Sequence, residues 1–224
     1  MIIVGAPNPV PTSATRAPRT SRSSTPASDG IHWLVRLAMY RGRKLRSVPS
    51  NLSSCCSCHG GTIGGSVAHA DAAADLPASL LALDATFVVR GESGTRSVPA
   101  AEFFKGIFET ALEPGELLTE IQVRKPSAPS AWSFQKFTKR AIDWAIVGVA
   151  VQGHSIALVN MGSTPLRATA AEAALAAGAS NADAAALAAD GTSAGSDIHA
   201  TKAYREHLAR VLVRRALDEA AARA

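Results

Sequence analysis

A glycine-rich run at residues 62–66, Thr-Ile-Gly-Gly-Ser, is the strongest candidate for a binding site in this sequence. Consecutive glycines let a backbone approach an anion closely and direct its N–H groups towards that anion. The residues that follow have helical character, and the start of a helix carries a partial positive charge. This combination suits a phosphate or a pyrophosphate. An ordinary tight turn before a helix fits the same five residues.

Other familiar site patterns do not match this sequence. The run is not GxGxxG and no P-loop lysine follows it, which excludes a Rossmann or Walker assignment. The three cysteines, Cys55, Cys56 and Cys58, are too crowded for a disulfide framework. His59 makes a Cys3His count possible, but the spacing is too tight for a tetrahedral zinc site. We therefore expect reduced thiols, a cytoplasmic protein and no bound metal.

The basic character of the 224-residue chain is confined to its first quarter. Residues 1–50 hold eight lysines and arginines against one acid, whereas residues 51–224 hold 15 basic and 17 acidic residues. The net charge of +5 therefore gives no reason to expect a nucleic-acid partner. No stretch approaches the ~18 consecutive apolar residues of a membrane helix, so we expect no transmembrane segment.

The first half of the chain changes character near Gly60, where we expect ordered structure to begin. Residues 1–30 are rich in proline, serine and arginine, which predicts disorder. Residues 31–46 fit either a short basic amphipathic helix or an unfolded stretch. The elements predicted from there to residue 124 are a helix over 67–85 interrupted at Pro77, a hairpin over 85–99, a helical turn over 99–108 whose Phe103, Phe104 and Phe108 enter the core, and a strand over 116–124.

The second half of the chain begins with a segment rich in proline and serine, with two of each within residues 125–130. This composition is typical of a hinge and indicates a domain boundary. The elements predicted after it are strands over 132–140, 145–153 and 155–162, then helices over 164–178, 181–190 and 200–221. Strands first and helices after them are typical of an α+β domain.

Several longer motifs occur in one order from Gly60 onwards. They are TIGGSVAHADAAADLP, LLALDATFVVRG, AAEFF, GELLTEIQV, FTKRAIDWAIVGVAV and VNMGSTPLRA. Together they closely resemble the FAD-binding medium subunit of molybdenum hydroxylases, above all of the aerobic carbon monoxide dehydrogenase type. The xanthine dehydrogenase flavin domain is a more distant likeness. The resemblance implies an α+β chain: an incomplete PCMH-type FAD-binding α/β subdomain over 60–124, then a domain over 130–224 with a three-stranded antiparallel sheet packed with helices.

The resemblance also implies a set of cofactor-binding residues and no catalytic or metal-binding residues on this chain. The backbone of the loop would hold the FAD pyrophosphate, a carboxylate would contact the dinucleotide, an apolar side chain would contact the flavin, and a lysine would lie beside the isoalloxazine. A cation there would stabilise negative charge on the reduced flavin, although a solvated strand lysine is the alternative. These residues are Thr62, Ile63, Gly64, Gly65, Ser66, Asp75, Leu118 and Lys136.

The implied function is an electron relay. FAD would receive electrons from a 2Fe–2S small subunit, supplied by a large subunit that carries the molybdenum cofactor, and pass them to an acceptor. The family also has an earlier AGGQS-type loop, which the 61 residues before Thr62 lack. Residues 1–59 do not resemble the family, so we interpret the chain as truncated or frame-shifted, with a genuine fusion to a basic tail as the rival. The alternative function is a fragment that docks in the complex without binding flavin.

Overall fold

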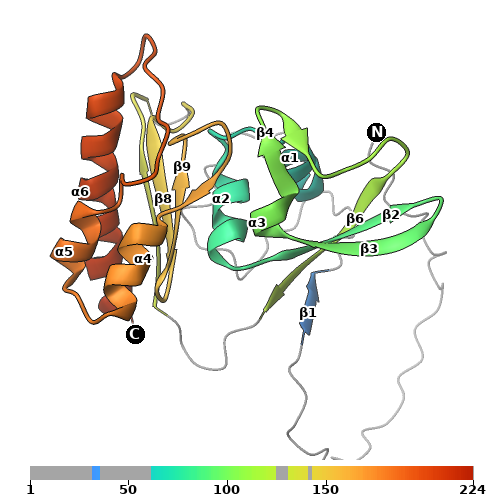
Figure 1. Cartoon of the computed structure of the whole chain (residues 1–224), viewed down its shortest axis with the longest axis horizontal. Helices are drawn as coiled ribbons and strands as arrows, with labels where there is room; N and C mark the ends of the chain where they lie inside the picture. Colours follow the sequence, from blue (N-terminus) through green and yellow to red (C-terminus); the bar gives the residue numbers. More distant parts are fainter. Residues whose placement is uncertain (1–31, 36–61, 125–130, 141–142, 224) are drawn as a thin grey trace, which may run out of the picture.

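The computed structural model describes residues 32–35, 62–124, 131–140 and 143–223, which form two four-stranded antiparallel sheets with a helix between them, and a small two-stranded sheet (Figure 1). Across the first sheet the strands are β1 (His32–Val35), β6 (Leu117–Arg124), β2 (Thr86–Gly91) and β3 (Gly94–Pro99). Across the second they are β10 (Leu166–Arg167), β9 (Ser155–Val159), β8 (Val147–Gln152) and β7 (Trp132–Phe137).

The first sheet confirms the predicted hairpin and the predicted strand that follows it. Strands β2 and β3 pair directly, and Phe87 and Val89 alternate into the core with no exposed surface. Residues 32–35 form a strand, so the helical alternative for 31–46 is wrong at these four positions. The edge of β6 that β2 leaves free offers them backbone partners along its length. The other predictions for residues 1–59 lie outside the described residues.

The second sheet has four strands, whereas the sequence suggested three. The additional strand is β10, which pairs with Leu158 and Ala157 of β9. The helix predicted from residue 164 therefore begins later, as α4 (Thr169–Ala176). Pairing with the exposed edge of β9 satisfies the backbone of residues 166 and 167 before the chain turns into the helix. The predicted end of this helix is confirmed by Gly178, whose φ of +86° is the left-handed conformation typical of a helix end.

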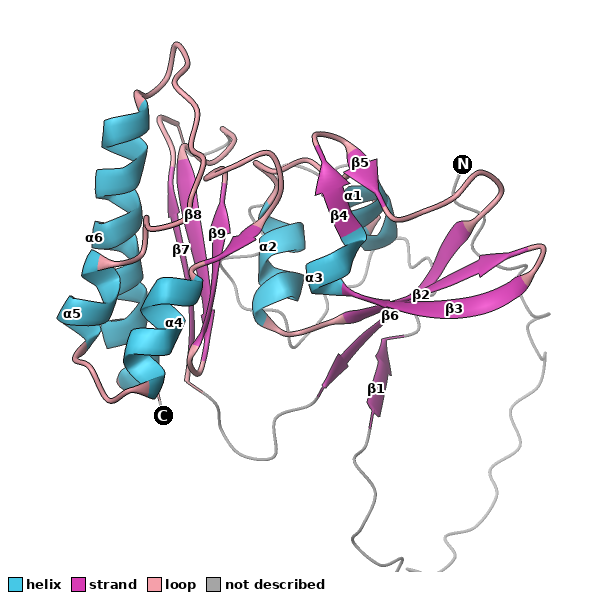
Figure 2. Ribbon diagram, viewed as in Figure 1, coloured by secondary structure: helices cyan, strands magenta, loops and turns pink. Residues whose placement is uncertain are grey.

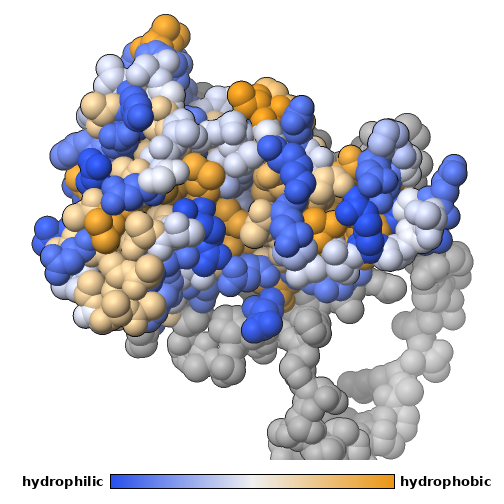
Figure 3. All heavy atoms as spheres, in the orientation of Figure 1, coloured by the Kyte–Doolittle hydropathy of each residue, from blue (hydrophilic) through white to orange (hydrophobic). Residues whose placement is uncertain are grey.

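Helices cover both faces of the second sheet (Figure 2). The helices of the described residues are α1 (Ile63–His69), α2 (Asp75–Ala82), α3 (Ala100–Phe103), α4, α5 (Asn181–Ala186) and α6 (Lys202–Ala221). Helix α6 packs on one face of the sheet, with α4 and α5 beside it, and α2 packs on the other. The outer surface of α4 and α5 is rich in alanine and forms a pale orange area in Figure 3.

Side chains along β8 alternate between the two faces of the sheet, so the strand contributes to two hydrophobic clusters. Val147, Val149 and Val151 belong to the cluster that packs against α6. Ala150 belongs to the cluster that includes α2, and Gly148 shares its face by alternation. A side chain at Gly148 would come within 3.0 Å of Val159 on the adjacent strand. Small residues on this face therefore let α2 lie close to the sheet.

The aromatic residues of the 99–108 segment are divided between core and surface. The rings of Phe87 and Phe103 lie 4.5 Å apart, and those of Phe103 and Phe104 lie 5.3 Å apart, in edge-to-face contacts. The predicted helical turn ends at Phe103, where the chain enters the hairpin of β4 (Phe104–Gly106) and β5 (Glu109–Thr110). Phe108 lies in the turn of this hairpin and is 57% exposed, so its predicted place in the core is wrong.

None of the helices in the described ranges is both long enough and apolar enough to cross a membrane. The last helix illustrates the point. Helix α6 has 20 residues, but lysine, arginine, glutamate and aspartate recur along it.

A bidentate ion pair between Arg96 and Glu116 joins the β5–β6 connection to β3, the edge strand of the first sheet. The Nε of Arg96 on β3 donates to Glu116 Oε1 at 2.8 Å, and its Nη2 donates to Glu116 Oε2 at 2.6 Å. The same Nη2 donates to the carbonyl of Ala111 at 2.6 Å. Hydrogen bonding from Arg96 lowers the pKa of Glu116 from 4.5 to about 2. The pair therefore stabilises the fold above pH 4.5, and its contribution is lost as the pH falls towards 2.

We expect Glu116→Gln to lower the free energy of unfolding at neutral pH, with the deficit relative to wild type shrinking between pH 4.5 and 2. Urea denaturation across this pH range measures the difference. Glu92→Gln, in the exposed turn of the β2–β3 hairpin, is the matched control and should follow the wild type throughout. A Glu116→Gln deficit that stays constant down to pH 2 would contradict this role for the ion pair.

Candidate functional site

The glycine-rich run forms the first turn of helix α1, which corrects the prediction of a free loop. Thr62 is the N-cap residue, and its Oγ1 accepts a hydrogen bond from the Gly65 N–H at 3.0 Å. The Ser66 N–H donates to the Thr62 carbonyl at 3.0 Å and closes the turn. A threonine in this position is a strong helix-initiating residue, and it overrides the flexibility that two glycines give the chain.

The turn still presents an open, positively polarised backbone. Ile63 and Gly64 occupy the first two helical positions, where N–H groups have no acceptor within the helix. Apart from its chain neighbours and the backbone of its own helix, a Cβ atom built at Gly64 would meet no atom of the described residues within 4 Å. The backbone at Gly64 can therefore be approached closely by an anionic group. The backbone N–H groups that the sequence predicts for an anion are present, but they belong to the start of a helix and not to a loop.

Asp75 and Lys136, which are 61 residues apart in the chain, form a shielded ion pair. Lys136 Nζ lies 2.9 Å from Asp75 Oδ2, and the two side chains are 16% and 2% exposed. Lys136 is thus not the solvated strand lysine of the alternative interpretation. The second oxygen, Asp75 Oδ1, is buried and has no hydrogen-bond partner among the described residues. A buried acceptor without a donor is costly, so this atom is suited to a donor from a ligand.

Strand alternation explains why Lys136 meets α2. On β7, Phe134 belongs to the core cluster that includes α2, and Lys136 shares its face. Ser133 and Gln135 lie on the opposite face, where both donate to the Glu219 carboxylate of α6. The residue paired with Lys136 on β8 is Gly148, which has no side chain to compete for the space.

Leu118 comes from a different sheet. It lies on β6, directly paired with Val89 of β2, and is half-buried against the core cluster that contains Phe87. Helix α1 packs on β6, so the strand that carries Leu118 lies next to the helix that carries Gly64. The predicted site residues therefore lie at the start of α1, on α2, on β6 of the first sheet and on β7 of the second sheet.

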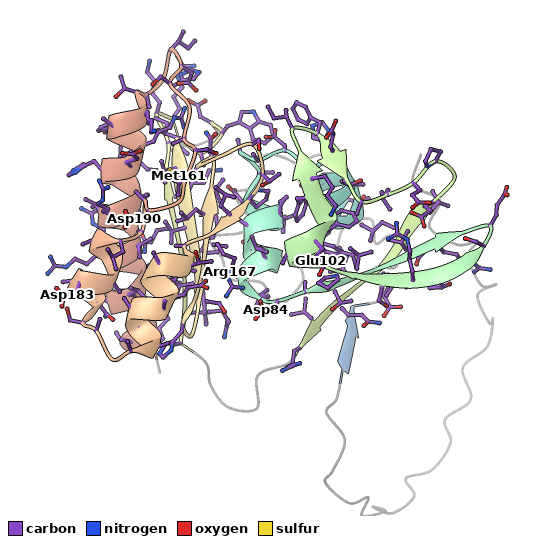
Figure 4. The ribbon with its side chains drawn as sticks, viewed as in Figure 1. Asp84, Glu102, Met161, Arg167, Asp183 and Asp190 are labelled. Atoms are coloured by element: carbon purple, nitrogen blue, oxygen red, sulfur yellow. The ribbon has the colours of Figure 1, made fainter. Side chains whose placement is uncertain are left out.

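Sequence reasoning missed an arginine at the other end of α2. Arg167 on β10 donates from Nη1 to the Leu81 carbonyl at 3.2 Å and to Asp84 Oδ1 at 2.6 Å. Its Nε donates to Glu172 Oε1 at 2.6 Å. Figure 4 shows Arg167 beside Asp84, which follows α2. The local pair with Glu172, five residues later, is the only part of this network that sequence spacing could have suggested.

Two family profiles match the chain. The family described as FAD binding domain in molybdopterin dehydrogenase matches residues 58–126, and the CO dehydrogenase flavoprotein C-terminal domain matches residues 132–220. These ranges contain the first and second sheets, apart from β1. They also contain every predicted cofactor-binding residue. The crowded cysteines at 55–58 lie outside the described residues.

Similar proteins carry related names. The carbon monoxide dehydrogenase medium chain of Hydrogenophaga pseudoflava is 36% identical over 176 residues, covering 73% of this chain and 61% of the relative. The 6-hydroxypseudooxynicotine dehydrogenase complex subunit alpha of Paenarthrobacter nicotinovorans is 37% identical over 178 residues, covering 73% and 60%. The chain thus spans about three fifths of the length of these relatives.

Solved structures agree with the sequence comparisons. Carbon monoxide dehydrogenase from Hydrogenophaga pseudoflava superposes with a TM-score of 0.68 and 40% identity, covering 73% of this chain and 61% of that one. Quinoline 2-oxidoreductase from Pseudomonas putida 86 superposes with a TM-score of 0.64 and 34% identity, covering 72% and 61%. The chain belongs to the family of FAD-binding medium subunits of molybdopterin dehydrogenases, which includes the carbon monoxide dehydrogenase medium chains, and it covers part of its relatives' length.

Proposed function

We propose that this chain binds FAD and works as the flavin subunit of a molybdenum hydroxylase. In that role it passes electrons from iron–sulfur clusters to an acceptor. The observation that carries the proposal is the buried Asp75 carboxylate, which Lys136 holds through one oxygen while the other lacks a donor. An unsatisfied buried acceptor inside the region that matches an FAD-binding family is best explained by a cofactor that supplies the donor.

The residues present fit this cofactor. The open backbone at Ile63 and Gly64 would hold the pyrophosphate, because its N–H groups have no acceptor within the helix and lie at a helix start. Asp75 Oδ1 would accept a hydrogen bond from the dinucleotide, and Leu118 would provide an apolar contact to the flavin. FAD, when bound, supplies the electron-transfer chemistry. Lys136 would hold positive charge beside the ring system, where it favours the negative charge of the reduced state.

The two matched regions would then share one cofactor. We assign residues 60–124 to the cofactor-binding domain and 130–224 to a second domain that contributes Lys136. The names of the relatives, medium chain and complex subunit, favour a multi-subunit assembly. Its other members would be a large subunit with the molybdenum cofactor and a small 2Fe–2S subunit. The crowded Cys55, Cys56 and Cys58, unsuited to disulfides, favour the cytoplasm as its location.

A second candidate role is docking within such a complex without flavin. The observation in its favour is the absence of an AGGQS-type loop from the 61 residues before Thr62. Without that loop, half of the expected pyrophosphate-binding backbone would be missing. FAD binding by the purified chain distinguishes the two roles directly.

We expect the chain to bind added FAD and to absorb near ~450 nm after removal of free cofactor. Gly64→Leu should abolish this binding, because its side chain would occupy the space that an anion needs at the helix start, while the fold remains stable. Gly195→Leu is the matched control, since that glycine also has nothing within 4 Å among the described residues and lies in a distant loop. Equal FAD affinity in both variants, measured by fluorescence titration, would exclude the proposed backbone site. A colourless wild type would favour the docking role.

A double-mutant cycle on the ion pair tests the second part of the site. Lys136→Met should lower the free energy of unfolding by about 3 kcal/mol, because it leaves the Asp75 carboxylate buried without a counter-charge. Asp75→Asn in the same background should recover part of that loss, giving a coupling energy above ~1 kcal/mol. The exposed pair Arg214 and Asp218, with a distance of 3.9 Å, is the control and should show a coupling below ~0.5 kcal/mol.

The same variants separate structural from cofactor effects. Asp75→Asn should weaken FAD binding at least ~10-fold, because an amide is a weaker acceptor than a carboxylate. Urea denaturation without FAD and fluorescence titration with FAD provide the two measurements. A coupling energy as small as that of the control pair, together with unchanged FAD affinity, would remove Asp75 and Lys136 from the site.

A further inference from the structure

A pocket of about 500 Å³ lies at one end of the second domain, and none of the proposed flavin residues lines it. Its volume is in the range of small-molecule sites. Its lining comes from the segment before α2, from residues 139–140 and 143–146 between β7 and β8, from Asn160 after β9, from the segment leading into α6 and from α6 itself. Its lining includes the side chains of Lys139, Arg140, Asp143, Trp144, Asp197 and Arg205.

Arg205 forms a fixed, buried part of the pocket wall. It is 3% exposed, and its guanidinium donates to the Ile146 carbonyl and to Asp197 Oδ2. The other oxygen of Asp197 accepts from the backbone N–H groups of His199 and Ala200 at 2.8 and 2.9 Å. Both oxygens of Asp197 therefore have donors, and its charge is balanced by Arg205. This carboxylate is not available to attract a cation into the pocket.

The remaining charges of the pocket favour an anion. Lys139 and Arg140 are exposed at its rim, and neither forms an ion pair among the described residues. Asp143 is the one carboxylate left to oppose them, and only its backbone N–H makes a described hydrogen bond, to the Arg140 carbonyl at 3.0 Å. Two exposed cations against one acid give the rim a positive potential.

An aromatic side chain accompanies these cations. Trp144 is 53% exposed, whereas the next residues, Ala145 and Ile146, are buried in the core. An exposed indole in the wall of a concave site offers a flat face for ring stacking. The pocket thus combines an aromatic face, cations at the rim and a guanidinium in the wall.

We infer that this pocket binds a small planar aromatic acid, with its ring against Trp144 and its anionic group held by Lys139 and Arg140. Charge alone would suit any anion, and an apolar wall alone would suit any hydrophobic compound. Only a ligand with both features uses both parts of the pocket. The inference does not depend on flavin binding, since no proposed flavin residue contributes to the pocket.

The test uses the full chain without FAD and naphthoate as the probe, titrated by calorimetry. We expect saturable binding at one site that weakens as salt is added. Naphthamide, which has the ring without the charge, and cyclohexanecarboxylate, which has the charge without the aromatic ring, should each bind at least ~10-fold more weakly. Absence of saturable naphthoate binding, or equal binding of naphthamide, would overturn the proposal.

Paired variants locate the binding. Lys139→Gln/Arg140→Gln should weaken naphthoate at least ~10-fold and reduce the salt dependence. Trp144→Leu should weaken it ~5-fold. Arg214→Gln and Phe108→Leu, which change an exposed arginine and an exposed aromatic elsewhere, are the controls and should bind as wild type does. Circular dichroism confirms folding of each variant. If naphthoate binds all variants equally, the pocket is not the site and the proposal fails.

Discussion

Helix α2 is buried between two sheets, and cations from the second sheet hold both of its ends. Seven of its eight residues are buried, all except Leu76. Lys136 pairs with the carboxylate of the first residue, Asp75, and Arg167 donates to the Leu81 carbonyl near the last turn. Arg167 satisfies a carbonyl at the C-terminal end of a helix that is shielded from water, and Lys136 balances the buried charge of Asp75. The second sheet therefore fixes the position of the helix that carries the proposed flavin carboxylate.

A backbone contact extends this dependence to the segment before α2. The Asn160 N–H, just after β9, donates to the Ala72 carbonyl at 2.8 Å. Asn160 has a φ of 61°, a conformation that asparagine tolerates better than most residues, and its side chain donates to the Ala145 carbonyl at 2.7 Å. One residue thus joins the segment before α2 to the β7–β8 connection. Asn160 also lines the pocket described above, so the same residue contributes to that pocket and positions the segment before α2.

Local sequence patterns correctly predicted the elements that carry a clear pattern of their own. The β2–β3 hairpin follows from a β-branched run and its turn residues, β6 and β7 follow from alternation, β8 and β9 follow from apolar runs, and α6 follows from its helical period. Two predictions were wrong because contacts outside the predicted segment decide the structure. Strand β10 exists because β9 has a free edge, and Phe108 is exposed because a hairpin turn carries it away from the other phenylalanines. The glycine-rich pattern predicts a loop at Thr62, where a threonine in fact caps the start of α1.

The sequence by itself determined the family, the order of the elements and the residue types of the proposed site, since these are encoded in local motifs and periods. Only the tertiary structure decided how those residues combine. Asp75 and Lys136 meet because β7 alternates towards α2, because Gly148 leaves room beside the lysine, and because the Asp75 carboxylate is buried at the start of α2. A charge pair of this kind is set by packing between distant segments, and sequence spacing carries no signal for it.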